Sequence, residues 1–376
     1  MPDAGAGLLA ALCARIARAG PLTVAAYMQA CLADADGGYW QKRASIGAAG
    51  DFITAPEISQ IFGELIGLWC AVVWRDLGRP ACVRLVELGP GRATLMRDAL
   101  RAARAAPNFL AAASVHLIEA SRPLRALQRR TLAAAAPPAA AAVPRAAGAR
   151  TGAFPAIAWH ATIAGVPPGP AIIIANEFLD ALPIRQLVFA DGEWRERVVV
   201  ADAAGGLRFA LGARADAGPR AMQPPGPGTI CELRPGEEVL LAALARRRAP
   251  LVALFLDYGP AADAFGDTLQ GVLAHAYVDP FAAPGAADLT AHVQFAPLCR
   301  KVRAAGLATD GPIPQAEFLG RLGIAERAAR LMAANPRRAA EIEAGAVRLM
   351  SPTGMGGLVK ALAVRSPHLP QPPAFG

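Results

Sequence analysis

The sequence predicts an α/β protein with a doubly wound, mostly parallel sheet. Apolar runs typical of strands alternate along the chain with segments of helical spacing. One run, Val83 to Val86, leads into a glycine turn and then into an Ala/Arg/Leu segment that suits a helix. Residues 171–175 (AIIIA) and 251–256 (LVALFL) are wholly apolar, as is typical of parallel strands covered on both faces.

Residues 1–80 predict a helical N-terminal region that contributes to the active site. Apolar residues at helical spacing indicate two helices within residues 8–35 and a third from Glu57 to Leu77. A glycine-rich segment separates them. Thr54 and Glu57 have the spacing of a capping box at the start of the third helix.

The sheet is expected to begin at Val83, within a main domain of residues 81–365. Val83–Leu88 and Val115–Glu119 predict its first two strands, and Arg92–Ala105 predicts the crossover helix. A second helix at 124–132 leads into a loose Ala/Pro loop at 133–150.

Residues 184 to about 250 predict an insertion on the sheet, because alternation around Asp191-Gly192 indicates a β-hairpin. A polar, proline-punctuated region follows Asp257 and runs to Gln294. Beyond it the pattern predicts helices at 295–305, 315–334 and 336–349, a closing edge strand at Leu358–Val364 and a flexible tail at 366–376.

Composition excludes several classes of protein. No apolar run reaches the ~18 residues that span a bilayer. Six scattered cysteines without a CxxC pair favour a reduced bacterial cytoplasm and argue against a zinc site. The net charge of +8 comes from dispersed arginines, which argues against a nucleic-acid partner. His275, Asp288 and His292 fit no metal motif, so we expect no metal.

The glycine turn is Glu87-Leu88-Gly89-Pro90-Gly91, at the carboxyl end of the first strand. Thr94 stands where a dinucleotide fingerprint has its third glycine. Glu119 ends the second strand, where a carboxylate can take two ribose hydroxyls. The combination favours an adenosyl ligand without a pyrophosphate, and S-adenosylmethionine (SAM) is the main candidate. An ordinary strand-to-helix turn is the alternative.

Further acidic and amide side chains follow the apolar strand at 171–175. Asn176, Glu177 and Asp180 come directly after it. If the methyl acceptor is a guanidinium, paired carboxylates would hold it and concentrate electron density on the attacking nitrogen. Glu177 is the leading candidate, and the possible partners are Asp180, Glu57 and Glu232. The alternative is that these strand-end residues only cap helices.

The chain resembles the MidA-like family of class I SAM-dependent methyltransferases over nearly its whole length. The motifs that carry the resemblance are GDFITAPEISQIFGELIG (50–67), VELGPGRATLMRDALR (86–101), HLIEAS (116–121), NEFLDALPIRQ (176–186), LDYG (256–259), PGAADLTAHVQF (284–295) and RLMSPTGMG (348–356).

The resemblance implies site residues. It implies that Gly89, Pro90 and Gly91 cradle SAM and that Glu119 holds its ribose. It also implies that the 50–60 segment belongs to the active site. We therefore expect the cofactor site to include Asp51, Thr54 and Gln60 as well, together with Glu87 and Asn176.

The resemblance also implies an acceptor, because mitochondrial members of the family methylate an arginine of a respiratory complex I subunit during assembly. For this chain we expect symmetric dimethylation of an arginine in the large quinone-proximal subunit of a bacterial NADH dehydrogenase. Two alternatives are an assembly chaperone that binds SAM without turnover and a small-molecule methyltransferase.

Three positions depart from the family pattern. Ala93 stands where glycine is common, Gln294 where aspartate is usual, and Ala274 where a basic residue precedes His275. We expect SAM binding to survive the first change. The other two bear on acceptor specificity if they face the substrate.

Overall fold

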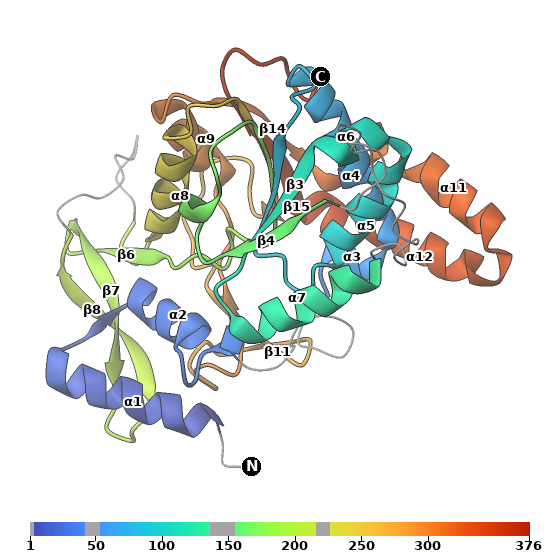
Figure 1. Ribbon diagram of the computed structural model, residues 1–376. Helices are drawn as coiled ribbons and strands as arrows, with labels where there is room; N and C mark the ends of the chain where they lie inside the picture. The colour runs from blue at the N-terminus through green and yellow to red at the C-terminus, as the bar shows by residue number, and fades with distance from the viewer. Residues whose placement is uncertain (1–3, 42–52, 136–154, 216–225) are drawn as a thin grey trace. The chain divides into compact units, whose positions relative to one another are not determined.

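The computed structural model describes residues 4–41, 53–135, 155–215 and 226–376 (Figure 1). Two compact units divide the chain. One combines residues 1–52, 180–240 and 262–292, and the other combines residues 53–179, 241–261 and 293–376. These limits differ from the predicted ones at 80 and 184, because the N-terminal helices group with the insertion while residues 53–80 group with the main sheet. In what the structure describes, no helix is long and apolar enough to cross a bilayer.

The second unit contains a seven-stranded sheet with the order β14-β15-β10-β5-β2-β3-β4. Strands β10, β5, β2, β3 and β4 are parallel, and β15 and β14 are antiparallel additions. The strands are β2 (Val83–Leu88), β3 (Ala113–Ile118), β4 (Ile157–His160), β5 (Ala171–Asn176), β10 (Leu251–Tyr258), β14 (Ala308–Pro314) and β15 (Val359–Arg365). The strand of this sheet that comes first along the chain, β2, lies inside the sheet. Along the chain, β3 and β4 are added on one side of β2, and β5 and β10 are added on the other. The carboxyl end of β2 is therefore a topological switch point, where such sheets bind ligands.

Helices cover both faces of this sheet: α4 and α5 lie on one side and α9 lies on the other (Figure 1). Its helices are α3 (Ala55–Ile58), α4 (Gln60–Asp76), α5 (Thr94–Ala102), α6 (Pro107–Ala112), α7 (Arg122–Ala135), α9 (Phe295–Ala304), α10 (Gln315–Arg321), α11 (Ile324–Ala334), α12 (Ala339–Met350) and α13 (Met355–Leu358). The apolar residues predicted for the buried strands are buried. Gly67 lets α4 approach α5, since a Cβ there would lie 2.4 Å from the Ala99 carbonyl oxygen. The predicted α/β class is confirmed.

Several predicted elements need correction. The helix expected from Glu57 to Leu77 is two helices, because Ser59 is extended and caps α4 through Ile61 N–H (3.3 Å). The helix expected at 315–334 is also two, α10 and α11, and Gly323 between them has φ +82°. Strand β15 is not an edge strand, because β14 pairs along its outer side.

The end of the chain packs onto the second unit, whereas the sequence predicts a flexible tail at 366–376. Phe375 is 8% exposed and its ring centroid lies 5.4 Å from that of Phe318. Trp69 Nε1 donates a hydrogen bond to the Pro373 carbonyl oxygen (3.1 Å). These contacts hold the proline-rich segment against α4 and α10.

The first unit contains a five-stranded sheet and a three-stranded one. The larger sheet consists of β1 (Leu22–Thr23), β6 (Arg185–Ala190), β7 (Glu193–Ala201), β8 (Leu207–Arg214) and β9 (Ile230–Leu233). The predicted hairpin is present: Asp191 and Gly192 both have positive φ, as a two-residue turn of this kind requires. The two predicted N-terminal helices are α1 (Ala4–Ala19) and α2 (Val24–Ala33).

The small sheet, in the order β12-β11-β13, lies in the region predicted as irregular. Its strands are β11 (Gln270–Leu273), β12 (Ala276–Val278) and β13 (Asp288–Thr290). Their lengths of three or four residues explain why no alternating pattern was visible. Helix α8 (Pro235–Ala245) begins in this unit and ends in the other.

Candidate active site

The glycine turn connects β2 to α5 through left-handed backbone. Gly89, Gly91 and Ala93 all have positive φ, at +60°, +50° and +62°. A Cβ on Gly89 would lie 2.7 Å from Phe178 Cδ2, so this glycine is needed for both its backbone conformation and the neighbouring ring. A left-handed turn directly before a helix N-terminus presents backbone N–H groups to a ligand.

Glu119 follows β3 at the same edge of the sheet. The Ser121 N–H donates to its Oε1 (2.8 Å), and Gln128 Nε2 donates to its Oε2 (3.1 Å). Burial raises the pKa of this carboxyl group, while the hydrogen bonds from Ser121 and Gln128 oppose the rise. A carboxylate offers about four acceptor sites, so Glu119 can also accept a hydrogen bond from a hydroxyl group of a ligand.

Glu87 and Asn176 lie on the same face of the sheet, on the adjacent strands β2 and β5. Glu87 pairs with Ile174, two residues before Asn176, and alternate residues share a face. Glu87 Oε2 and Asn176 Oδ1 are buried without a hydrogen-bond partner in the part of the chain that is described. Burial raises the pKa of Glu87 to about 8. A ligand that brings N–H groups, such as the ammonium of SAM, would supply donors to Asn176 Oδ1 and, once Glu87 ionises, to its carboxylate.

Glu177 occupies a strained position at the end of β5. Its φ is +48°, which is unusual for a residue with a side chain, and such strain gathers at functional sites. Its Oε1 accepts hydrogen bonds from the Ala55 N–H (3.0 Å) and from Asn176 Nδ2 (3.2 Å). Burial raises the pKa of this half-buried carboxyl to about 7, and the nearby Asp257 adds to the rise.

Asp257 fixes the loop that follows Glu177. It is fully buried at the end of β10, and its Oδ2 accepts hydrogen bonds from the N–H groups of Phe178 (3.1 Å) and Leu179 (2.8 Å). The Glu177 N–H donates to the Leu256 carbonyl oxygen (2.8 Å). Asp257 thereby sets the position of the Phe178 ring against the glycine turn.

The predicted capping box at Thr54 and Glu57 is wrong. Thr54 is the N-cap of α3, but its side chain makes no capping hydrogen bond, and Glu177 takes the Ala55 N–H instead. Glu57 accepts a hydrogen bond from the Thr94 hydroxyl, at the first residue of α5, and lies 3.9 Å from Arg92 Nε. It therefore joins α3 to the glycine turn.

The other predicted site residues are spread over the chain. Gln60, at the start of α4, donates to Glu64 Oε1 (3.4 Å). Asp51 lies outside the described residues. Asp180 and Glu232 belong to the first unit, where Gln186 and Thr268 donate to both oxygens of Glu232. That network gives Glu232 a structural role, whereas the pairing of Asp180 with Glu177 stays a prediction.

Three residues in this region were not predicted as site residues: Gln128, Phe178 and Asp257. Gln128 had a visible signal. It lies four residues after Leu124 and four before Leu132, on the buried face of α7. A polar side chain at that spacing marks a buried hydrogen-bonding group. For Asp257 the sequence showed only that it is one of several polar residues that follow an apolar strand.

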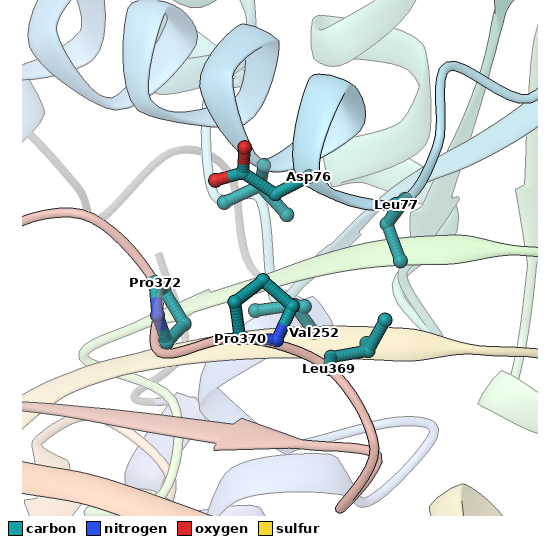
Figure 2. Close-up of a pocket in the computed structure, with 7 residues that line it drawn as sticks. Asp76, Leu77, Val252, Leu369, Pro370 and Pro372 are labelled. Carbon is teal, nitrogen blue, oxygen red and sulfur yellow. The ribbon is translucent and has the colours of Figure 1, made fainter.

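A shallow depression lies elsewhere, at the amino end of β10 (Figure 2). Its lining is mostly apolar, with one carboxylate from Asp76. It lies at the sheet edge opposite to Glu119 and Glu177, so it is not part of the candidate active site. The described residues include no group of three or more His, Cys, Asp or Glu side chains that could hold a metal ion.

Residues 65–313 match the model of the family described as "Putative S-adenosyl-L-methionine-dependent methyltransferase". The chain belongs to this family. The match covers the glycine turn, Glu119 and Glu177, whereas Ala55, Glu57 and Gln60 precede the matched region.

Two kinds of relative agree with this assignment. The protein arginine methyltransferase NDUFAF7 homolog of Drosophila melanogaster is 36% identical over 100% of this chain and 89% of its own length. The human mitochondrial protein arginine methyltransferase NDUFAF7 is 36% identical, over 91% of this chain and 79% of its own. A Burkholderia thailandensis crystal structure with S-adenosyl-homocysteine bound has a TM-score of 0.83 and 28% identity, covering 100% of this chain and 96% of that one.

The chain is therefore a SAM-dependent methyltransferase, homologous to protein arginine methyltransferases. Its own residues fit the cofactor, because the turn at Gly89–Gly91, the carboxylate of Glu119 and the unpaired acceptors of Glu87 and Asn176 supply the donors and acceptors that SAM requires.

Proposed function

We propose that this methyltransferase methylates an arginine side chain of a respiratory complex I subunit, with symmetric dimethylation as the product. The target suggested by the family resemblance is the large quinone-proximal subunit of a bacterial NADH dehydrogenase, modified during assembly. The bacterial cytoplasm remains our expectation for the location, from the scattered cysteines of the sequence.

The carboxylate of Glu177 is the observation that carries this proposal. It stands at the carboxyl end of β5 on a left-handed residue, and Phe178, next in the chain, packs on the glycine turn. Among the described residues, both hydrogen bonds that this side chain accepts go to one of its oxygens, Oε1. The other can accept the N–H of a guanidinium, which is a donor of fixed geometry with no acceptor of its own.

Methyl transfer to an arginine requires that the attacking nitrogen be positioned against the methyl group and that one group accept a proton. SAM supplies a methyl group on a sulfonium sulfur. Glu177 holds the guanidinium by a charge-assisted hydrogen bond and concentrates electron density on the attacking nitrogen. Methylation releases one proton from that nitrogen. A carboxylate with a pKa of about 7 is suited to take it at neutral pH.

Local charge outweighs the overall charge of the protein. The net charge of +8 repels a cationic acceptor at long range. Dispersed surface charges are screened beyond about 8–10 Å, whereas a half-buried carboxylate acts on a group about 3–4 Å away. The acidic side chain at the site therefore decides whether an arginine binds.

Mass spectrometry of the subunit purified from a deletion strain and its parent tests the acceptor. We expect the arginine to be dimethylated in the parent and unmodified in the deletion strain. A deletion strain complemented with Glu177→Gln should resemble the deletion, while Glu341→Gln, at an exposed position of α12, should restore methylation. Unchanged methylation in the deletion strain would rule this acceptor out and favour a chaperone or a small-molecule methyltransferase.

In vitro, Glu177→Gln should keep the affinity for S-adenosylhomocysteine and lose methyl transfer. The glutamine oxygen can still accept the Ala55 N–H, so the local fold is retained. The neutral amide cannot hold the guanidinium as an anion. Turnover equal to that of the unchanged protein would remove Glu177 from this role.

A further inference from the structure

Gln128 is a buried amide on a helix whose other long polar side chains are arginines. It is 0% exposed, while Leu124 and Leu132, one turn before and after it, form the rest of the buried face of α7. Burying an amide costs free energy unless its groups are hydrogen bonded. The partners of Gln128 therefore indicate what the residue is for.

The amide of Gln128 has partners on both sides. Its Nε2 donates to the Gly91 carbonyl oxygen (2.9 Å) and to Glu119 Oε2 (3.1 Å). Its Oε1 accepts from the indole Nε1–H of Trp159 (2.9 Å). Three parts of the unit meet here: the glycine turn, the acid after β3, and β4.

Only one orientation of this amide satisfies these partners. An indole N–H can only donate, and a carbonyl oxygen and a carboxylate can only accept. Rotating the amide by half a turn would set donor against donor at Trp159 and acceptor against acceptor at Gly91 and Glu119. Trp159 is itself held, since the guanidinium of Arg129 lies 4.8 Å above the centre of its ring.

We infer that Gln128 is a positioning residue for the cofactor: it holds the Glu119 carboxylate, at a fixed distance from the glycine turn, in the orientation that receives the ribose hydroxyls. This inference rests on the SAM site of the proposed function and adds a residue that touches the cofactor only through Glu119. Because Nε2 bonds to one carboxylate oxygen and Ser121 to the other, the carboxyl plane cannot rotate.

The test uses Gln128→Met, which keeps the length and shape of the side chain and removes both polar groups. Isothermal titration would compare S-adenosylhomocysteine with its 2′-deoxyribose analogue. The unchanged protein should prefer the ribose form, and Gln128→Met should bind S-adenosylhomocysteine about tenfold more weakly and lose most of that preference. Glu119→Gln should have the same effect, and the double variant should be little worse than either single one.

Gln315→Met is the matched control. Gln315 is also 0% exposed and donates from Nε2 to the Leu349 carbonyl oxygen (2.9 Å), on the other side of the unit from Glu119. Its replacement should lower the melting temperature and leave affinity and ribose preference unchanged. This separates loss of a buried hydrogen bond from loss of cofactor positioning.

Trp159→Phe provides a second variant that keeps a ring in place and removes the indole N–H. It should reduce the ribose preference less than Gln128→Met does, because the amide keeps its bonds to Gly91 and Glu119 and loses only the donor to its oxygen. If the unchanged protein binds no S-adenosylhomocysteine, the proposed function itself is wrong. If it binds and both variants keep the full ribose preference, the positioning role of Gln128 is refuted and the site stands.

Discussion

Replacing Glu87 with glutamine should remove a pH dependence from the stability of the cofactor-free protein. Glu87 is 3% exposed, and burial raises its pKa to about 8 from an ordinary value of 4.5. The native state holds this proton more tightly than the unfolded state does. The contribution of Glu87 to the free energy of unfolding is therefore fully present below pH 4.5 and is lost as the pH rises toward 8.

The magnitude follows from the two pKa values. A difference of about 3.5 pKa units amounts to ~5 kcal/mol once the group is ionised in both states, and to ~3 kcal/mol at pH 7. Glutamine fills the same space, keeps an N–H donor as the protonated carboxyl does, and does not ionise. We therefore expect the stability of Glu87→Gln relative to the unchanged protein to improve by ~3 kcal/mol between pH 4.5 and pH 7.

Urea unfolding at several pH values, without cofactor, measures this difference. Glu343→Gln, at an exposed position of α12, is the control and should follow the unchanged protein at every pH. Subtracting the free energy of unfolding of the unchanged protein from that of Glu87→Gln at each pH also removes the contributions of other groups that titrate in the same range. Parallel stability curves for Glu87→Gln and the unchanged protein would refute the argument that burial keeps Glu87 protonated.

Three further predictions concern single positions. Ala93→Gly should stabilise the protein by ~1 kcal/mol, because Ala93 has a φ of +62°, which favours glycine. Ala99→Gly, inside α5, should destabilise it by a similar amount. Changes of the same sign for both variants in chemical unfolding would contradict this. Gly89→Val should abolish binding of S-adenosylhomocysteine in isothermal titration, because its Cβ would lie 2.7 Å from Phe178 Cδ2; undiminished affinity would exclude this turn from the site. Burial lowers the pKa of His116 to about 4 from 6.5, so the unfolded state gains a proton first and stability should fall by up to ~3 kcal/mol between pH 6.5 and 4. A His116→Gln variant should show a flatter profile over that range, and an equally steep one would disprove the assignment.

The parallel strands were predictable because burial on both faces makes each an uninterrupted apolar run. Val83–Leu88 matches β2 residue for residue, and Ala171–Ala175 falls one residue short of β5. Strand β14 could not be predicted in this way. Its sequence, Ala-Thr-Asp-Gly-Pro-Ile-Pro, has two prolines, which a central strand excludes but an edge strand tolerates.

The polar ends of the strands were predictable from the sequence, whereas the contacts of those residues were not. A polar residue after an apolar strand indicates the ligand-binding edge, and Glu119 and Glu177 were predicted as site residues on that ground. The hydrogen bond between Glu177 and Ala55 joins residues 122 positions apart, and that between Glu57 and Thr94 joins residues 37 apart. No local pattern specifies such pairs, because folding of the sheet brings them together.

If Glu177 holds the acceptor guanidinium as proposed, its hydrogen bond from the Ala55 N–H makes acceptor binding and the start of α3 linked equilibria. The carboxylate that caps this four-residue helix is the one assigned to the acceptor guanidinium. A guanidinium bound to Glu177 polarises the carboxylate and weakens its hydrogen bond to the Ala55 N–H. By linkage, that hydrogen bond lowers the affinity of Glu177 for the guanidinium by the same factor. Substitutions that strengthen or replace the cap at Thr54 should therefore change acceptor affinity without touching the acceptor.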